Sequence, residues 1–317
     1  MKKVKLRIQV NDLANYNDGL NVLVVGGTGQ IGSEIKALRN SNINLNFPDS
    51  KIFNLVNPNS IKDYLNDSDI DFIINAGAYT KVDKAEEEKE ICNSINNLGA
   101  KELAKESYRR NIGLIHISTD YVFGRNNSGP FDVNSKKDPI NYYGYSKSFG
   151  EDHVLIEHKD SLVIRMASLF SEYGDNFVKR ITNLLLNETE VRVISDQRIS
   201  LTYAGDFSNN ILKIIDLYNE KGSNDNNRII HFACSGYSDW YSVAEVIYNE
   251  IKFIDKDLIK ANLIPILLND WTSRALRAKD TRLKIDDTYF NDHNIELSSW
   301  KDSVRVVVRS ILEEIVK

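Results

Sequence analysis

The sequence is poor in the features that mark membrane, secreted and nucleic-acid-binding proteins. Its 317 residues include two cysteines and five prolines, and no run approaches the roughly 18 apolar residues that a membrane-spanning helix needs. The first residues lack an apolar stretch of signal-peptide length. A formal net charge of -5 and a pI near 5.7 offer no basic surface to nucleic acid or anionic lipid. We therefore expect a cytoplasmic protein with a small-molecule substrate, no nucleic-acid partner and no membrane contact, and we leave open whether it forms a homodimer.

The two cysteines predict no metal centre. Cys92 and Cys234 lie far apart, with no C-x-x-C spacing and no histidine pair around them, so we expect small buried residues rather than ligands or nucleophiles. With 42% hydrophobic residues, the chain can build a core in one large or two modest domains. Residues 1–19 precede the first recognisable unit. Residues 4–10 alternate like a half-buried strand, but the role of this extension stays open.

A short apolar strand runs directly into a glycine-rich loop and then into a helix. After residues 20–25, Gly26, Gly29 and Gly32 form a G-x-x-G-x-x-G pattern, and residues 33–39 have helical character. Such glycines allow a tight turn and the close approach of a pyrophosphate, while the helix N-terminus offers free N–H groups to the phosphates. A glycine pattern alone is weak. The strand before it and the helix after it predict a dinucleotide site.

Strands alternate with helices along the first half of the chain, which predicts a parallel, doubly wound sheet. A strand at 71–76 ends in the small residues of 75–78, and a strand at 113–118 delivers Thr119 at its carboxyl end, where ligands of open α/β sheets bind. The alternative is that Thr119 and Asp120 only cap a turn. We expect further strands at 162–167, 191–194 and 228–233, and helices at 60–65, 84–110, 143–158, 177–186, 206–217, 239–251 and 300–316.

Tyr143 and Lys147 are four residues apart, so on a helix they lie on the same face. A free phenol has a pKa of about 10 and exchanges protons poorly near neutrality. An ammonium group one turn away favours the phenolate and would bring that pKa towards the working range. The pair is a candidate acid for an alkoxide formed by hydride transfer. Because Tyr-x-x-x-Lys also occurs on ordinary solvated helices, this hypothesis depends on the glycine loop and the Thr119 strand end.

Four segments together resemble the extended short-chain dehydrogenase/reductases and, within them, the dTDP-4-dehydrorhamnose reductase family. They are the glycine loop with Gln30 and residues 75–86, 118–123 and 141–147. The likeness runs from about Leu20 to the C-terminus, and the Val-Asp-Lys-Ala-Glu sequence at 82–86 is especially typical of the family. The fold expected is α/β, a Rossmann-like doubly wound parallel sheet with a smaller mixed C-terminal substrate-binding region. The dinucleotide-binding domain would comprise residues 20–170, with about 203–236 returning to it, and the substrate-binding region residues 171–202 and 237–317.

The family pattern implies NADPH- or NADH-dependent reduction of the 4-keto group of a nucleotide-activated deoxysugar, in polysaccharide precursor synthesis. By position, Tyr143 would protonate the oxyanion, Lys147 would lower the phenol pKa and hold the nicotinamide ribose, and Thr119 would orient the carbonyl. The expected cofactor-binding residues are Gly26, Gly29, Gln30, Ile31, Gly32, Ala76, Gly77, Ala78, Tyr143 and Lys147. The expected substrate-binding residues are Thr119, Asp120, Tyr121, Asn176, Phe177 and Arg277. The choice between NADH and NADPH stays open, and no ligand cluster supports magnesium.

The substrate-facing segments depart from the family pattern. Ser168 stands where the family usually has Trp. In the loop that begins with Asp196 and Gln197, Ile199 and Leu201 stand where the family has Gly and Pro, and Ala278 stands where the family has another Pro. The cofactor and catalytic segments are intact, so we expect a reductase for which dTDP-4-dehydro-L-rhamnose is a poor or altered substrate. Two alternatives stay open: a nucleotide-sugar epimerase or dehydratase, and a non-catalytic NAD(P)-binding regulatory subunit.

Overall fold

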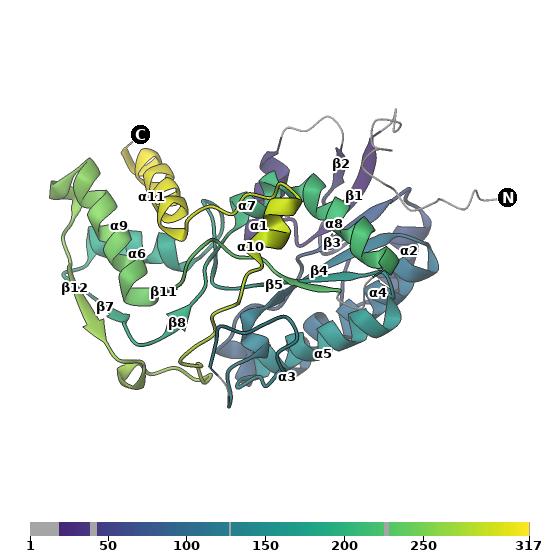
Figure 1. Ribbon diagram of the computed structural model, residues 1–317, viewed down its shortest axis with the longest axis horizontal. Coiled ribbons are helices and arrows are strands. Elements are labelled where there is room, and N and C mark those ends of the chain that lie inside the picture. Colours follow the sequence, from purple (N-terminus) through teal and green to yellow (C-terminus); the bar gives the residue numbers. More distant parts are fainter. Residues whose placement is uncertain (1–18, 39–42, 127, 225–227, 317) are drawn as a thin grey trace.

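A six-stranded sheet forms the larger part of the molecule in the computed structural model, which describes residues 19–38, 43–126, 128–224 and 228–316 (Figure 1). Its spatial order is β10-β5-β4-β3-β1-β2, and every neighbouring pair is parallel. The predicted doubly wound parallel sheet is confirmed. Its strands are β1 (Leu20–Val25), β2 (Ile43–Asn46), β3 (Phe72–Asn75), β4 (Gly113–Thr119), β5 (Leu162–Met166) and β10 (Ile229–His231).

Helices cover both faces of this sheet, which is why its central strands consist largely of buried apolar residues. Successive side chains of a strand point to opposite faces. Val22 and Val24 accordingly belong to the core under α1, α7 and α8, whereas Leu23 and Val25 belong to the core under α2, α4 and α5. These helices are α1 (Gln30–Ala37), α7 (Ala204–Asn209), α8 (Ile211–Asn224), α2 (Pro58–Asn66), α4 (Ala100–Arg109) and α5 (Tyr142–Glu157).

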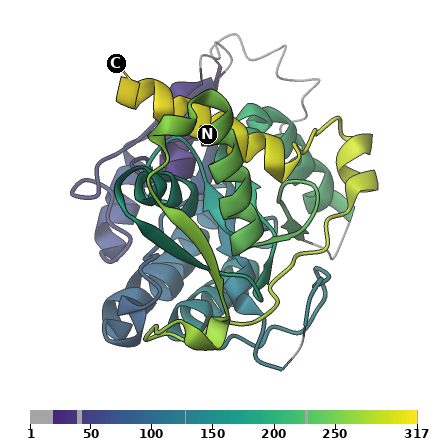
Figure 2. The same cartoon turned by 90° about the vertical axis from the view of Figure 1, so that its left-hand side faces the viewer.

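A second region has its own apolar core, built around Leu185, Ile247 and Val308. Figure 2 views the molecule from this side, with α9 in green and α11 in yellow. Its helices are α6 (Phe177–Asn187), α9 (Trp240–Ile254) and α11 (Trp300–Val316), and its parallel strand pair is β7 (Glu190–Ile194) with β12 (Asn262–Ile266). The short pairs are β6 (Leu169–Phe170) with β9 (Thr202–Tyr203) and β8 (Arg198–Ile199) with β11 (Ser238–Asp239). The exact domain boundaries stay a prediction.

The long helix predicted at 84–110 is interrupted. It consists of the 3-10 turn η2 (Lys84–Glu86), α3 (Lys89–Asn93), the π-helical turn η3 (Ser94–Gly99) and then α4. The wide π turn places Asn96 against two other segments: its Oδ1 accepts from the Tyr79 N–H at 2.7 Å, and its Nδ2 donates to Ser146 Oγ at 2.9 Å. Single π turns of this kind are frequent at functional sites.

Other expectations needed smaller corrections. The helix predicted at 206–217 is divided at Asn210, whose side chain donates to the Asp206 carbonyl at 2.8 Å and separates α7 from α8. Several short elements were not predicted, because elements of this length carry little periodicity. They are the four two-residue strands, the 3-10 turns η4 (Asp120–Val122), η5 (Lys256–Leu258) and η6 (Leu268–Asp270), and the helix α10 (Asp287–Asp292). Residues 4–10 lie outside the described residues. Within the described ranges, no helix is long and apolar enough to cross a membrane.

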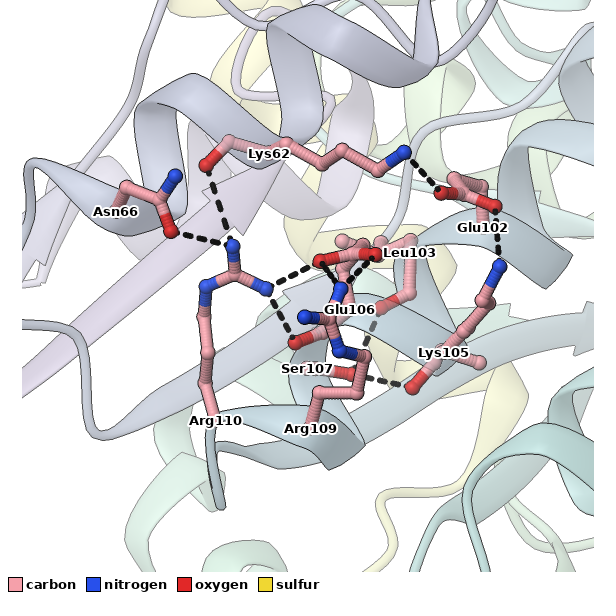
Figure 3. Close-up of polar contacts among 10 residues, drawn as sticks. Lys62, Asn66, Glu102, Leu103, Lys105, Glu106, Ser107, Arg109 and Arg110 are labelled. Atoms are coloured by element: carbon pink, nitrogen blue, oxygen red, sulfur yellow. Dashed lines mark hydrogen bonds and ion pairs between the residues drawn. The ribbon is translucent and has the colours of Figure 1, made fainter.

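A buried carboxylate ties α4 to α2 at the edge of the molecule opposite the second region (Figure 3). Glu106 is fully buried and accepts hydrogen bonds from Arg109, at 2.9 Å, and from Arg110. Arg110 also donates to the Asn66 side chain and to the Lys62 carbonyl. Burial alone would raise the pKa of Glu106, but the two guanidinium groups outweigh it and hold that pKa below its ordinary value.

Candidate active site

The glycine loop lies directly against the carboxyl end of β3. Gly26 has φ +85°, and a Cβ there would be 2.8 Å from the backbone of Ala76 and Gly77. A Cβ at Gly32 would be 2.5 Å from the Gly26 carbonyl oxygen. Both positions therefore require glycine so that the loop, β3 and α1 can meet. Gly29 differs, because it has φ -79° and a Cβ there would meet only the Gly26 oxygen, at 3.3 Å.

The first turn of α1 is arranged to receive an anion. Gly29 is the N-cap of α1 and has no side chain that could cap the helix. The first N–H groups of α1 therefore receive no side-chain acceptor from the N-cap residue. The Gln30 side chain donates to the Leu169 carbonyl at 3.4 Å, and its buried Oε1 has no partner among the described residues. Ile31 packs into the sheet core, and its part in cofactor binding stays a prediction. This cradle fits a dinucleotide pyrophosphate, as the sequence predicts.

The predicted catalytic pair is buried on α5, above the end of β4. Tyr143 is 9% exposed and Lys147 is 2% exposed. The Tyr143 ring meets the Tyr121 ring edge-on, with centroids 5.4 Å apart. Lys147 Nζ lies 2.7 Å from the Ile117 carbonyl oxygen and 3.4 Å from His116 Nε2. The helix thus brings Tyr143 and Lys147 to the strand end that carries Thr119.

The electrostatics of the site differ from the sequence-based expectation for the Tyr143 phenol. Burial raises the pKa of Tyr143, and a hydrogen bond with the Thr119 hydroxyl acts in the opposite direction. Burial also lowers the pKa of Lys147 to about 8. Desolvation has a larger effect on the phenol than any neighbouring cation, so the expected lowering of the Tyr143 pKa by Lys147 is not seen in the structure.

Two residues of the family-typical 82–86 segment hold the site together, which sequence reasoning did not foresee. Glu86 Oε1 accepts from the Tyr142 N–H at 2.8 Å and so caps the first turn of α5. Asp83 accepts from Arg277 Nη2 at 3.0 Å and from the Ala275 N–H at 3.0 Å. The segment therefore fixes both α5 and the 275–277 loop. The signal was present in the sequence as a typical motif, but its partners lie far along the chain.

A small cavity opens beside Thr119 and Asp120, between the sheet and the second region. Asp120 is 2% exposed, and burial raises the pKa of its carboxyl to about 6 against opposing hydrogen bonds from Thr281 and Thr119. Trp240 Nε1 donates to Gln197 Oε1 at 2.9 Å, and Gln197 in turn donates to the Ala278 carbonyl at 2.7 Å. The lining residues are Asp120, Tyr121, Phe123, Ile140, Asn141, Ser168, Gln197, Ile199, Trp240, Ala278 and Thr281.

The predicted substrate residues are only partly brought together. Asp120 and Tyr121 line the cavity, and the Arg277 guanidinium lies 5.9 Å from the centre of the Tyr121 ring. Phe177 packs against the cavity residue Trp240, with ring centroids 4.4 Å apart. Asn176 caps α6: its Oδ1 accepts from the Lys179 N–H, and its Nδ2 donates to the Ser171 carbonyl. Its contact with substrate stays a prediction.

The two cysteines are free and buried, as the sequence predicts. Cys92 lies beside α5, with its Sγ 3.2 Å from Ser146 Oγ, whereas Cys234 packs in the second core. Across the described residues, no group of three or more His, Cys, Asp or Glu side chains is placed to hold a metal ion.

The fold and the site define a class. A doubly wound parallel sheet, a glycine cradle at the first strand and a buried Tyr–Lys pair at the carboxyl edge are the parts of an NAD(P)-dependent oxidoreductase with a Rossmann-like fold. The model of the RmlD substrate binding domain family matches residues 20–313. The chain belongs to this family.

Similar proteins agree with this assignment. The chain is 33% identical over 230 residues to the spore coat polysaccharide biosynthesis protein SpsK of Bacillus subtilis, covering 72% of this chain and 78% of that protein. It is 29% identical over 298 residues to the dTDP-4-dehydrorhamnose reductase of Sinorhizobium fredii, covering 93% and 99%. The crystal structure of dTDP-4-dehydrorhamnose reductase from Bacillus anthracis in complex with NADP is 28% identical, with a TM-score of 0.81 over 93% of this chain and 99% of that one. The resemblance recognised in the sequence is confirmed.

Proposed function

We propose that the protein reduces the 4-keto group of a nucleotide-activated deoxysugar with NADPH or NADH, in the manner of a dTDP-4-dehydrorhamnose reductase in polysaccharide precursor synthesis. The observation that carries this proposal is the position of Tyr143. Its buried phenol lies at the carboxyl edge of the sheet, near enough to the Thr119 hydroxyl for that group to influence its pKa, and the cavity with the Asp120 carboxyl begins at the same strand end.

The residues of the chain take distinct roles in this reaction. The bound cofactor would supply hydride to the ketone carbon. Tyr143 donates its phenol proton to the oxygen of that carbonyl, and the raised pKa keeps this proton in place at neutral pH. Thr119 orients the carbonyl oxygen. Lys147 holds the nicotinamide ribose, and its ammonium form stabilises the phenolate that Tyr143 leaves behind.

The binding surfaces follow the same division. The pyrophosphate would lie on Gly26, Gly29 and the first turn of α1, since the loop has room for it only where side chains are absent. The sugar would lie next to Asp120, whose carboxyl can pair with a sugar hydroxyl. The cavity there has a volume of about 10 Å³, which is smaller than a sugar ring, so side chains that line it would have to move. We further propose a cytoplasmic location, and we leave the assembly state to measurement by light scattering.

The test is a panel of nucleotide-linked 4-ketosugars, scored for oxidation of NADPH and of NADH, with Tyr143→Phe as the matched inactive control. Turnover that the control lacks supports the proposal. A tightly retained cofactor with sugar interconversion but no net oxidation would instead identify an epimerase or dehydratase. Cofactor binding with no turnover on any sugar would favour a regulatory subunit. For authentic dTDP-4-dehydro-L-rhamnose, we expect kcat/KM below the ordinary enzyme range of about 10⁴ M⁻¹s⁻¹.

A further inference from the structure

Three buried polar side chains form a line from the end of β3 to the catalytic helix. Asn75 Nδ2 lies 3.0 Å from His116 Nδ1, and His116 Nε2 lies 3.4 Å from Lys147 Nζ. Asn75 and His116 are each 1% exposed, and Lys147 is 2% exposed. Polar groups as deeply buried as these need definite partners, so the direction of each hydrogen bond can be worked out.

The orientation of the Asn75 amide is fixed by the backbone. The Gly77 N–H donates to Asn75 Oδ1 at 3.2 Å. Turning the amide over would point its NH₂ group at this N–H, placing two donors face to face. Asn75 therefore presents its NH₂ group to His116, and His116 Nδ1 must be the acceptor.

This choice determines the tautomer of the imidazole. A neutral histidine carries one hydrogen, so an accepting Nδ1 leaves the hydrogen on Nε2, facing Lys147. Lys147 already has an acceptor in the Ile117 carbonyl, 2.7 Å away. A neutral amine matches these surroundings, because it can donate to the carbonyl and accept from the Nε2–H. An ammonium has no lone pair with which to accept.

We propose that His116, held by Asn75 as the Nε2–H tautomer, is a positioning residue that sets the protonation state of Lys147. In the cofactor-free protein the imidazole donates to the lysine and favours the neutral amine. The lysine gains its ammonium form when other acceptors enter the site. The catalytic consequence rests on the proposed function, whereas the tautomer is a property of the free protein.

Burial brings the amine and ammonium forms of Lys147 close in free energy. It lowers the pKa of Lys147 to about 8, with Glu151 of its own helix and Cys92 of α3 acting in the opposite direction. This pKa alone leaves the ammonium in the majority at neutral pH, so the neutral amine depends on the hydrogen bond from His116 Nε2. The charge of Glu151 is already balanced by Arg165, with two contacts of 2.9 Å, and by Lys137 at 3.3 Å. Burial also lowers the pKa of His116 well below its ordinary value, so the imidazole is neutral at working pH.

Asn75→Asp is the decisive variant. The aspartate can still accept from the Gly77 N–H, but it offers His116 Nδ1 an acceptor instead of a donor. The hydrogen should therefore move to Nδ1, and Nε2 should accept from an ammonium at Lys147. His116→Phe removes the imidazole and identifies its signals. His158→Gln is the matched control, because His158 is equally buried but bonds the Ile112 carbonyl, away from the site.

The first measurement is ¹⁵N NMR of the imidazole nitrogens in the cofactor-free full chain, which has five histidines to assign. We expect the neutral Nε2–H form for His116 and the Nδ1–H form in Asn75→Asp, with no change in His158→Gln. A neutral Nδ1–H form or an imidazolium at His116 in the parent protein overturns the proposal. So does an unchanged tautomer in Asn75→Asp. This spectrum is valid even if His116→Phe fails to fold.

The second measurement is the pH profile of kcat/KM for ketosugar reduction. Loss of the Lys147 ammonium should produce the alkaline limb, and Asn75→Asp should move that limb upward by about one pH unit or more, the scale on which a charged partner shifts a buried group. His158→Gln should leave it in place. An unshifted limb in Asn75→Asp overturns control of Lys147 by His116. If no ketosugar is reduced, the proposed function fails, while the NMR result still decides the tautomer.

Discussion

Glu106 offers the clearest test of what stabilises the sheet region, because its partners all lie outside the candidate active site. In Glu106→Gln, the fully buried carboxylate that joins Arg109 and Arg110 loses its charge but keeps its shape. Removing one member of a fully buried ion pair typically costs about 3–5 kcal/mol. Here Arg109 is 61% exposed and can return to water, so its share is small.

Arg110 contributes most of the expected loss. It is 19% exposed and keeps Asn66 and the Lys62 carbonyl as partners in the variant, so its charge is not left alone. The remaining loss is that of one charge-assisted hydrogen bond, about 1.5–3 kcal/mol. We expect a fall of about 2 kcal/mol in the free energy of unfolding at pH 7, measured by urea denaturation. Glu102→Gln is the matched control one turn earlier, and its exposed pairs with Lys62 and Lys105 should contribute less than about 0.5 kcal/mol.

The pH dependence distinguishes a charge effect from a packing effect. Because the folded pKa of Glu106 lies below its ordinary value, its stabilisation is complete above the unfolded pKa of about 4.3 and is lost as the pH falls through the folded pKa. The difference between parent and Glu106→Gln should be constant from pH 6 to 8 and should shrink in acid. An equal loss in Glu102→Gln, or a difference that persists in acid, would refute this reasoning.

Three further predictions concern the candidate site. Tyr143→Phe should reduce turnover at least about a hundredfold with cofactor affinity nearly unchanged, and near-normal steady-state turnover would contradict its assignment as the acid. Gly29→Val should fold normally, because a Cβ there meets only one loop oxygen, at 3.3 Å, but it should lose dinucleotide binding in calorimetry because its side chain would occupy the space of the pyrophosphate. Gly32→Ala should instead lower the melting temperature, because its Cβ would lie 2.5 Å from backbone atoms. Trp240→Phe should raise KM for the sugar nucleotide about tenfold with a smaller change in kcat. The variant leaves Gln197 Oε1 without its indole donor, and a buried acceptor without a partner costs about 1–3 kcal/mol. A lower kcat at unchanged KM would argue against that role.

The parts of the site that could be predicted from sequence are those encoded within one short segment. The glycine loop is such a case, since strand, loop and helix follow one another within residues 20–37. The Tyr143 and Lys147 pair is another, because one helical turn relates them. The parallel sheet was predictable for a similar reason: strands buried on both faces are continuous apolar runs separated by helices.

The supporting residues were not predictable, because each acts through a partner far along the chain. Glu86 caps a helix that begins 56 residues later, and His116 contacts a lysine 31 residues away. The π turn at Asn96 shows the same difficulty, since the sequence there is compatible with an unbroken helix. Its widening becomes intelligible only when the contacts to Tyr79 and Ser146 are known.

The cavity beside Asp120 is the extreme case, and the departures of its walls from the family pattern show why. Ile199 and Leu201 stand where a flexible and a rigid residue were expected, and both are 1% exposed in the second core. Apolar burial therefore fixes this loop in place of special backbone conformations. Ser168, at φ +43°, presents a small side chain to the cavity from another segment. Because the walls come from several separate segments, a substitution in one changes the shape that the others enclose. The residues proposed for the chemistry are encoded locally, whereas the proposed choice of sugar depends on how these distant segments pack together.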